Sequence, residues 1–452
     1  MIGTVASGGV NIHYHPKAHR DGPNRFLLSI SVQLYWRAFA HEILQRISSM
    51  KLAYLLSEYP TLVHTYLLRE VRQLRVMGVE IQTLSVRRPD LSAAPPSAEE
   101  KAERDVTWYL LGSGLGQHLA EHASTVLTRP LGYIRGLRLA LWFGRFHPRR
   151  TLLAMAYFAE AVLAGQRITR AGITHLHSVY STTVALILSR IFEVHLSITL
   201  HGSAEFINPD SFALSQKVEA AESICAISEY GRSQIMLWSP ARDWRKVHVT
   251  PLGVNVEDWV QAEFRQNPSP FELITVGRLV ETKGLPLLLE AVSALVKQGR
   301  NVRLTLVGDG PDRAALETLA ARLGIQDNIV FEGWKDQERL AQYYRQSDVF
   351  VMASFAEGIP VVMMEAMATG VPCVAPRITG IPELVRDGKD GILFTASNVE
   401  ELVDGVARMM DDPAMRRSMA ESSRARIGEK YDLQKNVERL ATVFNRWMGC
   451  DN

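Results

Sequence analysis

The feature that most constrains this chain is a regular alternation of short apolar runs with helix-like segments, which occurs twice. The first series starts with the apolar run 51–56 directly after Met50, and the second starts with Phe271–Val276. Such runs predict buried parallel strands, and their alternation with helices predicts βαβ units. The polar segment 261–270 between the two series contains two prolines and is typical of a linker. We therefore predict an α/β protein of two doubly wound, Rossmann-like domains.

The length of 452 residues agrees with two domains, because one hydrophobic core rarely supports so many. We predict a first domain at 50–260, a second at 261–430, and an amphipathic helix at 431–452 that crosses back to the first domain. A helical insertion at about 95–165 interrupts the first domain. Residues 1–49 lack a clear pattern, so either Met50 is the true start or 1–49 is a loosely attached extension. The further predicted strands are 79–86, 173–177, 197–200, 223–227, 246–250, 302–307, 328–331, 349–352 and 372–375.

Composition excludes several classes of protein. Apolar residues make up 47% and charged residues 22% of the chain, and the formal net charge is +2. These values are ordinary for a globular protein and argue against a nucleic-acid binder. The three cysteines, Cys225, Cys373 and Cys450, are far apart and form no Cys-x-x-Cys, so we predict neither disulfides nor a zinc site. No run of eighteen apolar residues and no signal-peptide pattern is present, which predicts a cytoplasmic protein.

One stretch of the insertion carries a strongly uneven charge. Residues 129–150 contain six arginines and no acid, interleaved with Tyr133, Trp142, Phe143 and Phe146. A basic helix with aromatic side chains can lie on an anionic membrane surface. An apolar helix face can equally pack on the sheet as core. The sequence leaves both interpretations open.

The strongest functional pattern is the segment 355–370, which contains Glu357, Pro360 and Glu365. Proline suits the first position of a helix, so we predict that a helix starts at Pro360. The amides of residues 361–363 would then form a site for an anionic diphosphate at the positive end of the helix dipole. Glu357 would lie just before this helix, and Glu365 in its second turn would lean toward the same cleft. The two carboxylates would accept hydrogen bonds from sugar and ribose hydroxyls.

Two cations follow the first strand of the second domain. Gly277 and Arg278 end that strand, and Lys283 precedes the next helix. Ligands of open α/β sheets bind at the carboxyl ends of the strands, where Arg278 and Lys283 could clamp a diphosphate leaving group. The turn Val307-Gly-Asp-Gly-Pro311 ends another strand, and we predict a structural role for its glycines.

Together these motifs resemble family 4 of the retaining glycosyltransferases, which have the GT-B fold of two Rossmann-like domains facing each other across a cleft. The resemblance rests on Gly-Arg-Leu followed by Lys-Gly at 277–284, on the turn at 307–311, and on the glutamates Glu357 and Glu365. It covers most of 50–447. The segment Ser57–Glu70 resembles the opening of exopolysaccharide and colanic-acid type transferases, although His64 stands where these usually have glutamate.

The resemblance implies a role for each matched residue. Arg278 and Lys283 would bind the donor diphosphate, Glu357 the donor sugar, and Glu365 the nucleotide ribose. His201, at the end of a predicted strand, would contact the sugar near the reacting carbon, and Glu205 stands where many relatives have an acid. The residues expected to close around the donor are Gly277, Gly358, Ile359 and Val361. Because the chain has no Asp-x-Asp triplet, we predict no metal and metal-independent turnover.

The predicted function is transfer of a sugar, with retention, from a UDP- or GDP-linked donor to a glycan or lipid-linked acceptor in cell-surface or exopolysaccharide biosynthesis. No other cofactor is expected. Two alternatives remain at this stage: a nucleotide-sugar epimerase of the same fold, and a non-catalytic scaffold in polysaccharide assembly. A phosphorylase would need a lysine-bound cofactor, for which the sequence gives no indication.

Overall fold

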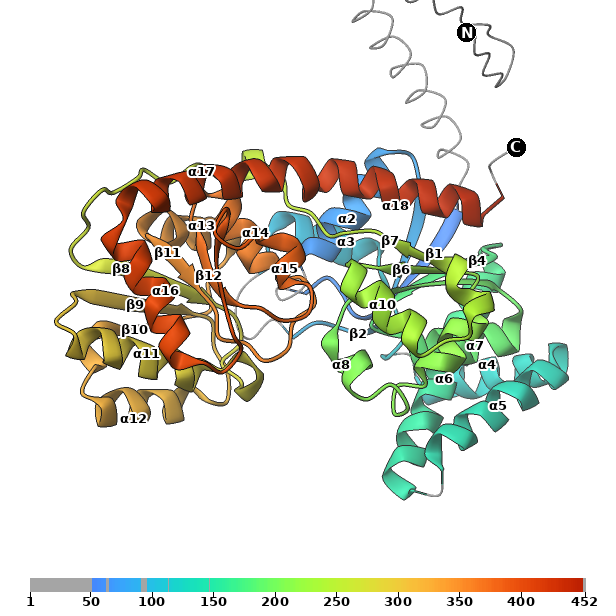
Figure 1. Cartoon of the computed structure of the whole chain (residues 1–452). Helices are drawn as coiled ribbons and strands as arrows, with labels where there is room; N and C mark the ends of the chain where they lie inside the picture. The colour runs from blue at the N-terminus through green and yellow to red at the C-terminus, as the bar shows by residue number, and fades with distance from the viewer. Residues whose placement is uncertain (1–50, 62–64, 91–95, 113, 146, 450–452) are drawn as a thin grey trace, which may run out of the picture. The chain divides into compact units, whose positions relative to one another are not determined.

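The computed structural model describes residues 51–61, 65–90, 96–112, 114–145 and 147–449. The described part contains two sheets in which every pairing between strands is parallel (Figure 1). The predictions for residues 1–49, Met50 and His64 lie outside the described residues. No helix of the described part combines the length and the apolar character needed to cross a membrane.

The first sheet has seven strands in the order β3-β2-β1-β4-β5-β6-β7. Its interior strand β1 is buried from Leu52 to Leu56, as expected for a parallel strand covered on both faces. The strands are β1 Lys51–Glu58, β2 Glu80–Arg87, β3 Trp108–Tyr109, β4 His175–Val179, β5 His195–Leu200, β6 Ser223–Ala226 and β7 Val247–Val249. The helices are α2 Thr65–Val76, α3 Ala98–Val106, α4 Leu115–Thr128, α5 Pro130–Gly144, α6 Pro148–Arg170, α7 Thr182–Phe192, α8 Ser203–Ile207, α9 Leu214–Ala220 and α10 Glu229–Leu237.

The second sheet has six strands in the order β10-β9-β8-β11-β12-β13 and a separate apolar core. Its strands are β8 Phe271–Val276, β9 Val302–Val307, β10 Ile329–Gly333, β11 Val349–Val351, β12 Cys373–Pro376 and β13 Gly391–Phe394. Its helices are α11 Leu285–Lys297, α12 Arg313–Leu323, α13 Gln337–Gln346, α14 Val361–Ala368, α15 Ile381–Leu384, α16 Val399–Asp411 and α17 Pro413–Lys430, and α18 Leu433–Trp447 follows them. The predicted class of two doubly wound α/β units is confirmed.

Two strands were missed by the sequence patterns. The insertion was predicted to be helical, but it also contains the two-residue strand β3, which pairs with Leu84 and Ser85 of β2. The four-residue strand β13 pairs with β12 at the edge of the second sheet. Both are short strands at the edge of a sheet, where pairing with one neighbour defines them.

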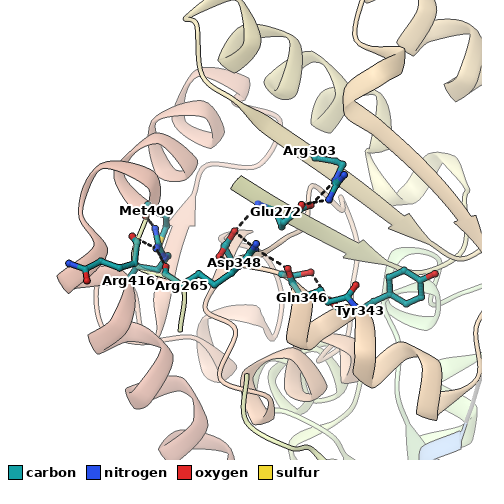
Figure 2. A network of polar contacts seen from close by, with 10 residues as sticks. Arg265, Glu272, Arg303, Tyr343, Gln346, Asp348, Met409 and Arg416 are labelled. Atoms are coloured by element: carbon teal, nitrogen blue, oxygen red, sulfur yellow. Dashed lines mark hydrogen bonds and ion pairs between the residues drawn. The ribbon is translucent and has the colours of Figure 1, made fainter. Parts of the chain in front are cut away.

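The segment between the sheets is fastened to the second one (Figure 2). Arg265 binds the buried carboxylate of Asp348 through two nitrogens, at 3.1 and 2.6 Å. Asp348 also accepts a hydrogen bond of 2.8 Å from the Glu272 amide on β8. Arg416 of α17 donates to the carbonyls of Arg265, Gln266 and Met409. These bonds fix the second half of the 261–270 segment against β8 and α17.

The end of the chain contacts the first sheet. The Val254 amide donates to the Tyr431 carbonyl at 2.9 Å, and the Leu433 amide donates to the Val254 carbonyl at 3.2 Å. Helix α18 then packs against α2 and β6. The ring of Phe444 lies 4.9 Å from the ring of His177 on β4. The last helix therefore completes the apolar covering of the first sheet.

The strand orders place one switch point in each sheet. In the first sheet the order reverses between β1 and β4, and in the second between β8 and β11. Ligands of doubly wound sheets bind in the crevice outside the carboxyl ends of the strands at such a point. The loops that follow β8, β11, β4 and β5 are therefore where a site is expected.

Candidate active site

The loop after β8 is shaped by close packing of backbone. A side chain at Gly308 would place its Cβ 2.0 Å from the Gly277 carbonyl oxygen, and one at Gly310 would lie 2.3 Å from the Leu279 carbonyl oxygen. The Leu279 amide donates to the Asp309 carbonyl at 3.0 Å. The glycines of the 307–311 turn thus let it support the 277–279 loop, in agreement with the structural role predicted for them. Gly277, Arg278 and Lys283 line one hollow at this loop.

Lys283 and Glu357 meet at the β8/β11 switch point. The Lys283 Nζ donates to Glu357 Oε1 over 2.6 Å, and both side chains are largely buried. Lys283 lies in the 3₁₀ turn before α11, and Glu357 lies in the loop between β11 and α14. The site thus holds a cation beside a carboxylate, which can bind a phosphate oxygen and a hydroxyl side by side.

Helix α14 starts one residue later than predicted. Pro360 has an extended ψ of 117° and is the N-cap, and Val361 is the first helical residue. The Pro360 carbonyl accepts from the Met363 amide at 3.1 Å and the Met364 amide at 3.3 Å. The prediction that the amides of 361–363 are all free is therefore wrong for Met363. The amides of Val361 and Val362 precede the first hydrogen-bonded turn and stay available for an anion.

Glu365 is buried in the second turn of α14 between residues of two other helices. Its Oε1 lies 3.6 Å from Nη1 of Arg69 on α2, and its Oε2 lies 3.4 Å from the Tyr344 hydroxyl on α13. Burial raises the pKa of this carboxyl to about 7, while the Arg69 guanidinium and the Tyr344 hydroxyl act in the opposite direction. Glu365 therefore changes charge near neutral pH, where its carboxylate form accepts hydrogen bonds only.

His201, the residue after β5, lies directly opposite the Glu357 loop. A Cβ at Gly358 would stand 2.2 Å from the His201 carbonyl oxygen, so only glycine allows this approach. The buried imidazole lies between Tyr66 on α2 and Tyr180 after β4, with ring centroids 5.4 and 5.2 Å away. Ile359 is also buried. The structure thus brings His201, Gly358 and Glu357 together from two separate sheets.

Glu205, four residues after His201, and Lys217 on α9 are both buried. Burial raises the pKa of Glu205, and the Lys217 ammonium and the Gly202 amide oppose that rise. Burial likewise lowers the pKa of Lys217 to about 8, against the attraction of Glu205. Each group is the principal charged partner of the other, which favours a role in shaping the His201 loop over direct contact with a ligand.

Two histidines on β4, to which the sequence assigned no role, have structural surroundings. The His177 ring is fully buried and bonds Ser197 Oγ at 3.1 Å and Thr199 Oγ1 at 3.0 Å. Burial lowers its pKa to about 3, so it stays neutral. His175 stacks on His195 with ring centroids 4.7 Å apart. Neither ring belongs to the group around His201.

Sequence reasoning missed the groups that join the two sheets. Arg69 lies within the Ser57–Glu70 segment, yet no local pattern indicates that it meets Glu365, almost 300 positions away. The carboxylate of Glu383 on α15 accepts hydrogen bonds from the Glu229 and Tyr230 amides, at 2.8 and 2.7 Å. It caps the N-terminus of α10 from the other domain. The only signal in the sequence is that Glu383 follows the carboxyl end of the predicted strand 372–375, at the edge where ligands of such sheets bind.

Two doubly wound sheets, with their switch-point loops joined by these contacts, define the GT-B fold of glycosyltransferases. Residues 259–426 match the family model described as glycosyl transferases group 1, so the second sheet, its helices and the preceding segment form a domain of that family. The chain has the GT-B fold that its motifs indicated, and its second domain is a glycosyl transferases group 1 domain.

Similar proteins extend this result to nearly the whole chain. WcaL of Salmonella typhimurium, named a putative colanic acid biosynthesis glycosyltransferase, is 26% identical over 409 residues, which are 87% of this chain and 99% of that protein. AmsK of Erwinia amylovora, an amylovoran biosynthesis glycosyltransferase, is 24% identical over 413 residues, 88% of this chain and 100% of that protein. The predicted resemblance to exopolysaccharide transferases is confirmed. The epimerase and scaffold alternatives gain no support.

Solved structures agree on the fold. Sucrose-phosphate synthase from Thermosynechococcus elongatus superposes with a TM-score of 0.70 at 18% identity, covering 89% of this chain and 100% of that one. HepE of Anabaena, crystallised with UDP-glucose, has a TM-score of 0.66 at 17% identity and covers 87% of this chain and 99% of that one. At these identities the likeness establishes the fold alone.

Proposed function

We propose that the chain transfers a sugar from a nucleoside diphosphate donor to a glycan or lipid-linked acceptor during exopolysaccharide biosynthesis. The observation that carries the proposal is the Lys283–Glu357 hydrogen bond of 2.6 Å at the β8/β11 switch point, in a loop whose Gly358 touches the His201 backbone. A cation, a carboxylate and an imidazole at one crevice match the phosphate, the hydroxyls and the reacting carbon of such a donor. The names of WcaL and AmsK support the polysaccharide setting.

In this proposal the second domain binds the donor. Arg278, Lys283 and the first amides of α14 would neutralise the diphosphate, which leaves with increased negative charge. Glu357 would accept hydrogen bonds from the sugar hydroxyls, and Glu365 from the ribose. Gly277, Gly358, Ile359 and Val361 would line the donor, because their backbone lies at the same loops.

The first domain would complete the reacting centre. His201, held between two tyrosine rings, would contact the sugar near its anomeric carbon from the side opposite the diphosphate site. Closing the two domains around the donor would position the acceptor and exclude water, and orientation of this kind accelerates transfer. We propose retention at the anomeric carbon, which matches the resemblance to family 4.

We further propose that the donor carries UDP or GDP and that turnover needs no metal. HepE is a relative in fold whose crystals contain UDP-glucose, which supports UDP as the first nucleotide to test. Arg278 and Lys283 would supply the positive charge that a metal supplies elsewhere. Turnover should therefore persist in excess chelator, and complete loss of transfer restored by added metal would contradict this part of the proposal. The proposal places the protein in the cytoplasm, with peripheral contact to the membrane through 129–150.

Replacement of Glu357 by alanine tests the function. We expect Glu357→Ala to abolish sugar transfer, measured as nucleoside diphosphate release in a screen of UDP- and GDP-sugars, while the far-UV spectrum and unfolding midpoint stay near those of the parent. Glu290→Ala, on the exposed side of α11, is the matched control and should retain full transfer. Undiminished transfer by Glu357→Ala would refute the assignment of this site.

A further inference from the structure

Helix α5 in the insertion packs inward through its smallest residues. A Cβ at Gly136 would lie 2.4 Å from Cγ1 of Ile191 on α7, and one at Gly144 would lie 2.3 Å from Oγ1 of Thr151 on α6. Ala140, between them in helical spacing, is fully buried. Glycine and alanine thus let α5 approach its neighbours closely, and they leave its bulkier side chains for other directions.

The opposite side of α5 exposes large apolar side chains together with arginines. We define the α5 face as Leu131, Ile134, Arg138, Leu141, Trp142 and Arg145, which recur every three or four residues and are all exposed. Leu131 keeps 69% of its surface exposed and Leu141 keeps 50%. An ordinary surface helix buries its leucines, so this arrangement reverses the expected one.

The helices that pack against α5 also expose large apolar side chains. Helices α4, α5 and α6 pack against one another (Figure 1). Leu127, near the end of α4, is 82% exposed, and Leu152, in the second turn of α6, is 75% exposed. Single exposed leucines need no explanation, but a group of them on successive helices is typical of an interaction surface.

The charge on this surface has one sign. Six arginines and no acid occur at 129–150. Arg135 pairs with Glu193 at 3.5 Å, whereas within the described residues no ion pair involves Arg138, Arg145, Arg149 or Arg150. The Arg145 guanidinium lies 4.4 Å from the centre of the Trp142 ring. A binding partner of this surface must therefore offer both negative charge and an apolar layer into which side chains can insert.

We propose that the α5 face docks on an anionic lipid bilayer, with Leu131, Leu141 and Trp142 entering the acyl boundary and the arginines binding lipid phosphates. Exposed apolar side chains beside arginine and tryptophan match the headgroup region in both polarity and charge. This inference rests on the proposed function, because it names the surface on which a lipid-linked acceptor would be met. It decides between the two interpretations that the sequence left open for 129–150.

Vesicle flotation of the full chain tests the inference without donor or acceptor. We expect binding to phosphatidylethanolamine–phosphatidylglycerol vesicles and little binding to phosphatidylcholine vesicles. Each arginine removed should weaken partition about fivefold, so Arg138→Glu combined with Arg145→Glu should weaken it at least about 25-fold. Leu131→Ser combined with Leu141→Ser should weaken it independently of salt. Arg322→Glu on α12 and Leu237→Ser on α10 are exposed controls that should bind as the parent does.

Two results would overturn the inference. One is equal binding of the parent and both double variants to anionic vesicles. The other is a concentration-dependent dimer of the parent that the same double variants dissociate, which would make the α5 face an interface between copies. Nucleotide binding and unfolding midpoints, measured on each variant, separate failure of docking from failure of the proposed transfer or of folding.

Discussion

The carboxyl edges of the two sheets present different chemistry on the same architecture. At the edge of the second sheet, Lys283 donates a hydrogen bond to Glu357. Glu365, also at this edge, forms an ion pair with Arg69. At the edge of the first sheet, His201 lies buried between Tyr66 and Tyr180. In the proposed reaction, the edge of the second sheet would bind the charged donor through its polar groups. The edge of the first sheet would orient the reacting sugar.

This difference explains why the same strand-and-loop topology occurs twice without a repeated motif. A diphosphate requires fixed cations and amides, which the β8 loop and the start of α14 provide. An acceptor and a sugar ring require contact over a surface of low charge, which aromatic rings and imidazole provide. Substitutions at the two edges should therefore change different properties of the protein.

Removal of Lys283 should have the largest effect. Lys283→Ala leaves Glu357 without its partner and the diphosphate without a cation, so we expect kcat/KM for transfer to fall about 10³-fold. Steady-state kinetics with the best donor measures the change, and Lys297→Ala, exposed at the end of α11, is the control. A loss of less than tenfold would mean that the second edge does not bind the phosphates through Lys283.

Glu365 should make stability depend on pH. Its pKa rises from 4.5 to about 7 on burial. Between these two pH values the folded chain therefore keeps a proton that the unfolded chain has lost. Its contribution to stability is complete below about pH 4.5 and is lost as the pH rises toward 7. Between about pH 4 and pH 8 the wild type should lose up to about 3 kcal/mol relative to Glu365→Gln.

Urea unfolding of both proteins across this pH range measures the difference directly. Other buried acids, such as Glu70, cancel because they are present in both chains. A difference that stays constant with pH would show that Glu365 remains ionised throughout, with Arg69 outweighing burial.

The two buried histidines should respond in different ways to the same change. His177→Ala removes a ring whose two nitrogens bond Ser197 and Thr199, and it should lower the free energy of unfolding by about 2 kcal/mol with little change in kcat of the remaining folded enzyme. His201→Ala should lower kcat more than it lowers stability. Unfolding and kinetic measurements on both variants test this difference. It would be contradicted if both variants mainly lowered stability, or if both mainly lowered kcat.

Arg69 should have the smallest effect, and that effect should depend on pH. Its guanidinium lowers the pKa of Glu365, so Arg69→Ala should leave Glu365 more protonated at neutral pH and less able to accept hydrogen bonds from ribose. We expect a donor KM about tenfold higher near pH 7, roughly one lost charged hydrogen bond, with recovery at higher pH. Arg69→Lys should restore most of the affinity. A loss that is independent of pH would mean that Arg69 acts only through packing.

Much of the fold follows from local patterns. The predicted strands 271–276 and 302–307 coincide with β8 and β9, because buried parallel strands are continuous apolar runs. Short edge strands such as β3 have no such signal, and they exist only through pairing. The start of α14 was one residue off, because proline is tolerated at both the N-cap and the first helical position, and only the backbone ψ distinguishes them.

The two α/β units and the residues that follow their strands were predictable from the sequence, since these depend on neighbours a few positions apart. The tertiary structure was needed to show that Arg69 meets Glu365, that Gly358 touches the His201 backbone, and that the His177 ring bonds Ser197 and Thr199. It also decided that α5 turns its glycines inward and its leucines outward. These facts depend on contacts between distant segments, which local hydrophobic periodicity does not encode.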